Sequence, residues 1–135
     1  MIKFTNGLVL NKDFEIESTD VYVDGGKIVK IGESTIKADR IYDLNGNLLM
    51  PSFKNAHTHS AMTFGRSFAD DLPLSSWLND KIFPLEAKLN GDDIYKLSKL
   101  AFLEYLTSGI TACFDMYYFP ENMAKASVDF GFRTV

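Results

Sequence analysis

The stretch DDIYKLSKLAFLEYLTSGITACFDM, residues 92–116, decides the fold that the sequence predicts. A helix is expected over residues 92–108, because apolar side chains recur there at the spacing of one helix face. Aspartates stand at its positive N-terminal end, and Gly109 suits its C-terminal cap. The apolar run 110–116 then predicts a strand of a parallel sheet covered on both faces. The apolar helix positions are Ile94, Leu97, Leu100, Ala101 and Leu106.

The segments on either side continue this alternation of strands and helices. Residues 52–59 predict a short strand before the helix, and residues 132–135 begin another strand. Pro120 at a first helical position and Gly131 as terminator frame a helix between them. The order is typical of a parallel α/β fold with right-handed crossovers. We expect the repeating unit to be unfinished at the last residue.

Residues 1–50 have a different pattern, with short strands separated by turns. Asp24-Gly25-Gly26 predicts a hairpin, because glycines supply the positive backbone angles of a tight turn. Asn45-Gly46 predicts a turn between another strand pair, and a β-meander is expected. Pro51 removes a ladder donor and marks a border. We therefore expect two domains, residues 1–50 and residues 51–135.

The segment between the strand at residues 52–59 and the long helix is expected to hold a brief helix. Ser75 or Ser76 is expected to cap it and Pro84 to end it. Trp77 on this helix could form the floor of a pocket, but it is interpreted as a core residue and left out of the site, since a tryptophan on an amphipathic helix is usually buried. Asp70-Asp71 is interpreted as a solvated turn, because adjacent carboxylates point in different directions.

Composition and charge exclude several classes of protein. Of 135 residues, 46% are hydrophobic and 24% charged, which is ordinary for a globular domain. A net charge of −4 provides no basic field, so nucleic acid is not an expected partner. Neither a signal peptide nor an apolar membrane span is present, so no membrane contact is expected. Cys113 is the only cysteine and is predicted to be buried, which favours a reducing, cytoplasmic location.

The two histidines of the chain, His57 and His59, are separated by one residue in Asn55-Ala56-His57-Thr58-His59. Alternate residues of a strand point to the same side, so the two imidazoles could bind one metal ion. The alternative is a pair of partly exposed polar residues at a strand end. A catalytic zinc site uses three protein ligands, and the sequence offers no obvious third.

This part of the chain resembles the amidohydrolase superfamily, and within it the methylthioadenosine and S-adenosylhomocysteine deaminases. The resemblance covers nearly all residues beyond 45. It is carried by residues 51–63, Gly65-Arg66, residues 69–74, Trp77-Leu78, Pro84-Leu85-Glu86, Gly109-Ile110-Thr111 and Asp115-Met116-Tyr117.

The resemblance implies a metal-dependent (β/α)8 barrel with a small β-sandwich. Residues 1–50 would be the N-terminal part of that sandwich, and residues 51–135 the first two to three strands of the barrel. It makes His57 and His59 ligands of a divalent metal, zinc or alternatively iron, and Glu86 a ligand of the substrate's ribose hydroxyls. The remaining ligands and the proton-transferring groups would come from later strands, so no catalytic acid or base is assigned among these residues.

The implied reaction is the deamination of an adenosine derivative, 5′-methylthioadenosine or S-adenosylhomocysteine, by metal-activated water with release of ammonia. Triazine chlorohydrolases and guanine deaminases share the histidine block and are alternatives. A further alternative is a non-catalytic truncated fragment, because a (β/α)8 barrel takes roughly 200 to more than 400 residues. The barrel would be incomplete in this chain, so we expect a homo-oligomer or association with the rest of the barrel.

Overall fold

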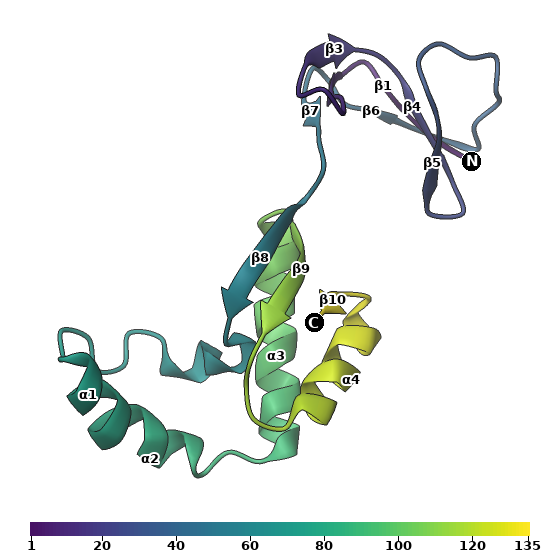
Figure 1. The fold of residues 1–135 in the computed structure, drawn as a ribbon. Coiled ribbons are helices and arrows are strands. Elements are labelled where there is room, and N and C mark those ends of the chain that lie inside the picture. The colour runs from purple at the N-terminus through teal and green to yellow at the C-terminus, as the bar shows by residue number, and fades with distance from the viewer. The chain divides into compact units, whose positions relative to one another are not determined.

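The computed structural model describes all residues 1–135 as an α/β chain of two compact units, Met1–Pro51 and Ser52–Val135 (Figure 1). The division falls where the sequence changes from short strands to alternating strands and helices. No helix is long and apolar enough to cross a membrane.

The first unit contains two small sheets. One has the strand order β5-β4-β1-β6 and the other the order β3-β2-β7. Strand β1 pairs antiparallel with β4 and parallel with β6, whereas β2 pairs antiparallel with β3 and parallel with β7. The strands are β1 (Ile2–Thr5), β2 (Leu8–Leu10), β3 (Ile16–Ser18), β4 (Val21–Asp24), β5 (Lys27–Ile31), β6 (Arg40–Asp43) and β7 (Leu48–Leu49).

The expected β-meander is therefore wrong, although one hairpin of it is confirmed. Gly25 and Gly26 both have positive φ and join the antiparallel strands β4 and β5. The chain leaves the first sheet after β1, where Asn6 adopts a φ of 54° and Gly7 packs too closely on Leu44 to admit a Cβ. This bend sends β2 into the second sheet.

Asn45-Gly46 forms the expected turn, with φ of 48° and 77°. The strands that it joins, β6 and β7, do not pair with each other, because β6 extends the sheet of β1 and β7 extends the sheet of β2. The two strands run parallel to neighbours that are themselves joined at Asn6-Gly7. The turn thus repeats the change of sheet that the chain makes after β1.

The second unit is built on a parallel sheet of order β10-β9-β8. Helix α3 connects β8 to β9, and helix α4 connects β9 to β10, which confirms the predicted alternation. Its elements are β8 (Phe53–Thr58), a 3-10 helix η1 (Ser60–Gly65), α1 (Leu74–Ser76), a π-helical turn η2 (Trp77–Ile82), α2 (Phe83–Glu86), α3 (Gly91–Thr107), β9 (Ile110–Asp115), α4 (Pro120–Phe130) and β10 (Arg133–Thr134).

Gly109, Pro120 and Gly131 mark helix ends where the sequence predicts them, and α3 has in addition an N-terminal cap that the sequence analysis did not assign. Asn90 caps α3 by accepting the backbone N–H groups of Asp92 and Asp93, and the Asp93 carboxylate accepts the N–H of Asn90 in return. Gly109 follows the helix with a φ of 79°. Pro120 begins α4, and Gly131 ends it in the left-handed region that glycine occupies without strain.

The brief helix differs from the prediction at both ends. It begins at Leu74 with Pro73 as the N-cap residue, so neither Ser75 nor Ser76 caps it. It also continues past Pro84 to Glu86, because the preceding turn widens and the Phe83 N–H bonds to the Leu78 carbonyl, five residues back. A widened turn accommodates a proline, which lacks an N–H and collides with the carbonyl of an ordinary turn.

The core of the second unit lies between the sheet and the two long helices. Buried side chains from α3, β9 and α4 meet there, including Phe102, Cys113 and Ala126. Helices α3 and α4 pack against each other and so cover the same face of the sheet, as two crossovers of one hand require. The expected coverage of β9 on both faces is therefore wrong for these residues, and Phe114 on the opposite face is 58% exposed.

Candidate functional site

The candidate site lies where β8 and β9 end. Their parallel register pairs Thr58 with Asp115 and brings the next residues of both strands to one edge of the sheet. The rings of His57 and His59 lie there with centroids 5.0 Å apart and nearly perpendicular. His57 is exposed, whereas His59 is half-buried. The structure therefore brings the two imidazoles together, as their spacing predicted.

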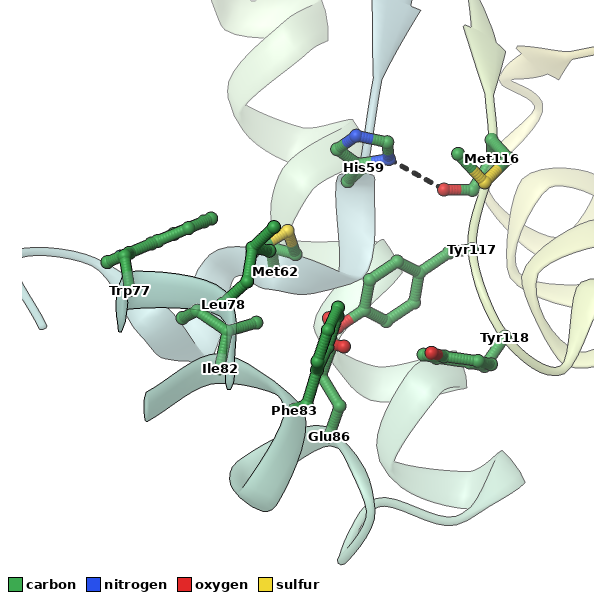
Figure 2. A pocket seen from close by; sticks show the side chains of 10 residues that line it. All are labelled: His59, Met62, Trp77, Leu78, Ile82, Phe83, Glu86, Met116, Tyr117 and Tyr118. Atoms are coloured by element: carbon green, nitrogen blue, oxygen red, sulfur yellow. Dashed lines mark hydrogen bonds between the residues drawn. The ribbon is translucent and has the colours of Figure 1, made fainter. Parts of the chain in front are cut away.

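A backbone hydrogen bond selects the tautomer of the neutral His59 ring. Its Nδ1 lies 2.7 Å from the carbonyl oxygen of Met116 (Figure 2). Because a carbonyl only accepts, Nδ1 must carry the proton of this bond, and the lone pair of the neutral ring is then on Nε2. Histidine ligands of metals use this arrangement, in which one nitrogen donates to a carbonyl and the other binds the ion. His59 thus fits a metal ligand.

Asp115 supports the loop that carries His59. It is 8% exposed, and its carboxylate accepts the backbone N–H of Ser60 at 3.2 and 3.3 Å. From α3, the Tyr105 hydroxyl lies within hydrogen-bond distance of Thr58 Oγ1, at 2.5 Å, and accepts the Ser60 hydroxyl at 3.3 Å. These bonds tie the residues on both sides of His59 to the sheet and to the helix behind it.

A cavity of about 490 Å³ opens beside His59. Its wall is largely apolar, with Trp77, Ile82 and Phe83 from the π-helical turn and α2 on one side (Figure 2). Glu86 is its one charged member. A volume of this size, with an apolar wall and a few polar groups, is typical of a site for a small molecule.

Glu86 receives a hydrogen bond across the cavity. The Tyr117 hydroxyl donates to Glu86 Oε1 at 2.7 Å, and both side chains are half-buried. Burial, and then the neighbouring Glu86 carboxylate, raise the pKa of Tyr117 well above its usual range. Tyr117 therefore remains a neutral donor throughout the ordinary pH range.

Other acidic and thiol groups of the second unit lie outside this arrangement. Asp70 and Asp71 are exposed in a loop and do not line the cavity. Cys113 is buried in the core, and this burial, with the nearby Asp115 carboxylate, raises the pKa of its thiol to about 11. The residues do not include a group of three or more His, Cys, Asp and Glu side chains arranged to hold a metal ion.

The Amidohydrolase family model matches residues 48–135, which include every side chain of the site. The chain belongs to the amidohydrolase family. This family is metal-dependent. The hydrogen-bonding arrangement of His59 is consistent with that property, because it leaves one ring nitrogen available to a metal ion.

Similar proteins include deaminases. This amidohydrolase is 43% identical over 132 residues to a 5′-deoxyadenosine deaminase of Methanococcoides burtonii, covering 95% of the chain and 30% of the relative. It is also 43% identical over 129 residues to a 5-methylthioadenosine/S-adenosylhomocysteine deaminase of Pyrococcus abyssi, covering 94% and 30%. The chain thus spans about 30% of the length of these relatives.

Solved structures share the fold. A crystal structure of an adenosine deaminase from Xanthomonas campestris with bound zinc has a TM-score of 0.83 at 28% identity, covering 99% of this chain and 33% of that one. A triazine hydrolase variant has a TM-score of 0.85 at 22% identity, covering 98% and 34%, which supports the fold alone.

Of the residues that line the cavity of this amidohydrolase, the sequence had assigned only His59 and Glu86 to the site, and Trp77 and Tyr117 are among those it missed. Trp77, interpreted as core rather than as the floor of a pocket, is half-buried and lines the cavity. Tyr117 also lines it, and its signals in the sequence were its position directly after the second strand and its place in the Asp115-Met116-Tyr117 block of the family resemblance. His57, in contrast, does not line this cavity, although its ring contacts that of His59.

Proposed function

We propose that this chain supplies the metal-binding corner and the ribose contact of a hydrolase that deaminates an adenosine derivative. The observation that carries the proposal is the geometry of one cavity. His59, with its Nε2 lone pair free, and Glu86, the one charged group, line the same apolar space. The similarity to deaminases of 5′-deoxyadenosine and of 5-methylthioadenosine/S-adenosylhomocysteine supports the substrate class.

His57 and His59 would hold a divalent metal, zinc by analogy with the zinc-bound adenosine deaminase or alternatively iron. When bound, such a metal would lower the pKa of a water and so provide the nucleophile for the amine-bearing carbon of the purine. Within this chain, the Met116 carbonyl holds the His59 proton on Nδ1 and so keeps Nε2 available. The bonds of Asp115 to Ser60 restrain the loop that carries the imidazole.

Glu86 would bind the ribose hydroxyls, and the apolar wall would contact the purine and the 5′ substituent. A carboxylate accepts several hydrogen bonds, and one side chain can therefore serve a pair of neighbouring hydroxyls. Trp77 and Phe83 offer flat apolar surfaces beside it, which suit an aromatic base and exclude water from it.

In the whole protein, residues 51–135 would form the first strands of a (β/α)8 barrel, and residues 1–50 part of a β-sandwich. The carboxyl ends of barrel strands carry the catalytic groups of such enzymes, and His57, His59 and Met116 lie at the carboxyl ends of the parallel strands β8 and β9, which supports this proposal. Further ligands and proton-transferring groups would come from outside these residues, through the rest of the barrel or a homo-oligomer. The single cysteine favours a cytoplasmic location.

The test is a substrate panel on the native protein isolated from its source cells. Ammonia release is measured with 5′-methylthioadenosine, S-adenosylhomocysteine, 5′-deoxyadenosine, adenosine and guanine, and chloride release is measured with a chlorinated triazine. We expect turnover of adenosine derivatives, loss of it on metal chelation and recovery with added zinc. Turnover of guanine or the triazine alone would contradict the proposed substrate, and activity that survives complete metal removal would contradict the metal.

A further inference from the structure

Two consecutive residues after β9 form hydrogen bonds to His59 and Glu86, the two cavity side chains used in the proposed function. The Met116 carbonyl accepts the Nδ1 proton of His59 at 2.7 Å, and the Tyr117 hydroxyl donates to Glu86 Oε1 at the same distance. Figure 2 shows the Tyr117 ring extending from this segment towards α2. One short segment thus sets the orientation of both groups.

Tyr117 is well suited to hold a carboxylate in one place. Its ring rotates about two torsions, so it loses less conformational freedom on ordering than a long flexible side chain does. The ring also packs edge-on against Tyr118 at a centroid distance of 5.4 Å and lies 6.4 Å from the His59 ring. A neutral hydroxyl held in this way donates a charge-assisted bond, which is stronger than a bond between neutral groups.

The hydrogen bond from Tyr117 engages only one of the two carboxylate oxygens of Glu86. Tyr117 engages Oε1, and no hydrogen bond within the chain engages Oε2. Without the tyrosine, the glutamate could rotate about its side-chain torsions, and neither oxygen would be fixed. A vicinal diol needs an acceptor in a defined place, because its two hydroxyls are held at a fixed spacing by the ring.

We infer that Tyr117 is a positioning residue that gives the site its preference for substrates with an intact ribose diol, by holding Glu86 Oε1 and leaving Oε2 to accept the diol. The inference rests on the function proposed above for Glu86. It assigns to Tyr117 an effect on the binding of one part of the substrate and none on the chemical step.

The test compares Tyr117→Phe with the unaltered native enzyme on 5′-methylthioadenosine and its 2′-deoxy analogue. We expect the KM for the ribonucleoside to rise about 10-fold, the value for loss of one well-placed polar contact, with kcat changed less than about twofold. The KM of the 2′-deoxy analogue should change less than about twofold, because that substrate lacks part of the diol. The preference for ribose then falls about 10-fold.

Tyr95→Phe is the matched control. The Tyr95 hydroxyl donates to the Asp129 carboxylate at 2.7 Å, a bond of the same chemistry and length that joins α3 to α4 away from the cavity. Its removal should leave the ribose preference unchanged. An equal rise in KM for the ribonucleoside and its 2′-deoxy analogue in Tyr117→Phe would indicate a merely structural role and overturn the inference.

Glu86→Gln separates the inference from the proposed function. If Glu86→Gln removes the ribose preference and Tyr117→Phe does not, the positioning role is wrong while the role of Glu86 stands. If Glu86→Gln also keeps the preference, Glu86 does not bind the diol, and both assignments are overturned. The variant with both Tyr117→Phe and Glu86→Gln provides a further check. If Tyr117 acts through Glu86, this variant should lose no more ribose preference than Glu86→Gln alone, whereas additive losses of preference would overturn the inference.

Discussion

Cys113 illustrates how burial sets the chemistry of a single side chain. The residue is 3% exposed, and its sulfur lies 3.9 Å from Asp115 Oδ2. Burial is the larger cause and the nearby carboxylate the smaller cause of a pKa of about 11, against an ordinary value of 9.0. Both causes disfavour the thiolate, so the thiol loses its proton at a higher pH in the folded chain than in the unfolded chain.

We predict that native Cys113 resists alkylation at pH 8. A pKa of about 11 leaves about 100-fold less thiolate than the ordinary value of 9.0 does. The stabilising contribution of the protonated thiol is complete below about pH 9 and is lost as the pH rises towards 11. Iodoacetamide labelling, followed by mass spectrometry with and without urea, measures the difference. Equal labelling rates in folded and unfolded protein would contradict it.

At the scale of elements, caps and turns place the site. The π-helical turn lets the helical segment pass Pro84 and end at Glu86, so a local irregularity places in the cavity the side chain that we propose to bind the ribose. Helix α3 begins after Asn90 with a reciprocal capping box, and this helix carries the Tyr105 hydroxyl that ties down the loop of His59. A loss of order in α3 would therefore also loosen the residues on both sides of His59.

We predict that Asn90→Ala destabilises the second unit by about 1 kcal/mol, because it leaves the N–H groups of Asp92 and Asp93 without their side-chain acceptor. Asn90→Ser should recover most of this loss, since a serine hydroxyl also caps. Urea unfolding of the native protein and both variants measures the change. An unaltered transition midpoint in Asn90→Ala would show that the cap contributes nothing.

At the scale of the whole molecule, the sheet of the second unit is covered on one face. Helices α3 and α4 lie together on that face, and the other exposes Phe114 at 58%. Phe53 and Met116 are 60% and 63% exposed at the two ends of the strands. Exposed apolar surface on a sheet with open edges favours association with another polypeptide.

We predict that the 135-residue chain expressed alone associates with itself. Sedimentation should show species heavier than the 15.2 kDa of one chain, and a dye that binds apolar surface should fluoresce with it. Phe114→Ser should reduce both self-association and dye fluorescence. Val128→Ser is the control: Val128 is 79% exposed on α4, away from the uncovered sheet face, and its replacement should reduce neither. A sharp monomer without dye binding would contradict the prediction.

The sequence by itself determined the features that depend on neighbours along the chain. The spacing of apolar residues predicted α3, the glycines predicted the β4–β5 hairpin, and Pro120 and Gly131 predicted the ends of α4. The histidine pair was also visible, since alternation along a strand places His57 and His59 together. These features follow from backbone geometry and short-range sterics, which a few consecutive residues specify.

The tertiary structure decided which distant residues meet. His59 and Met116 are 57 residues apart, and Glu86 and Tyr117 are 31 apart, so their bonds depend on the register of β8 with β9 and on the path of the segment between them. The passage of the helix through Pro84 likewise depends on a widened turn that propensity does not predict. Such contacts arise from packing between elements, and the free energy of packing belongs to the assembled fold rather than to any local stretch of sequence.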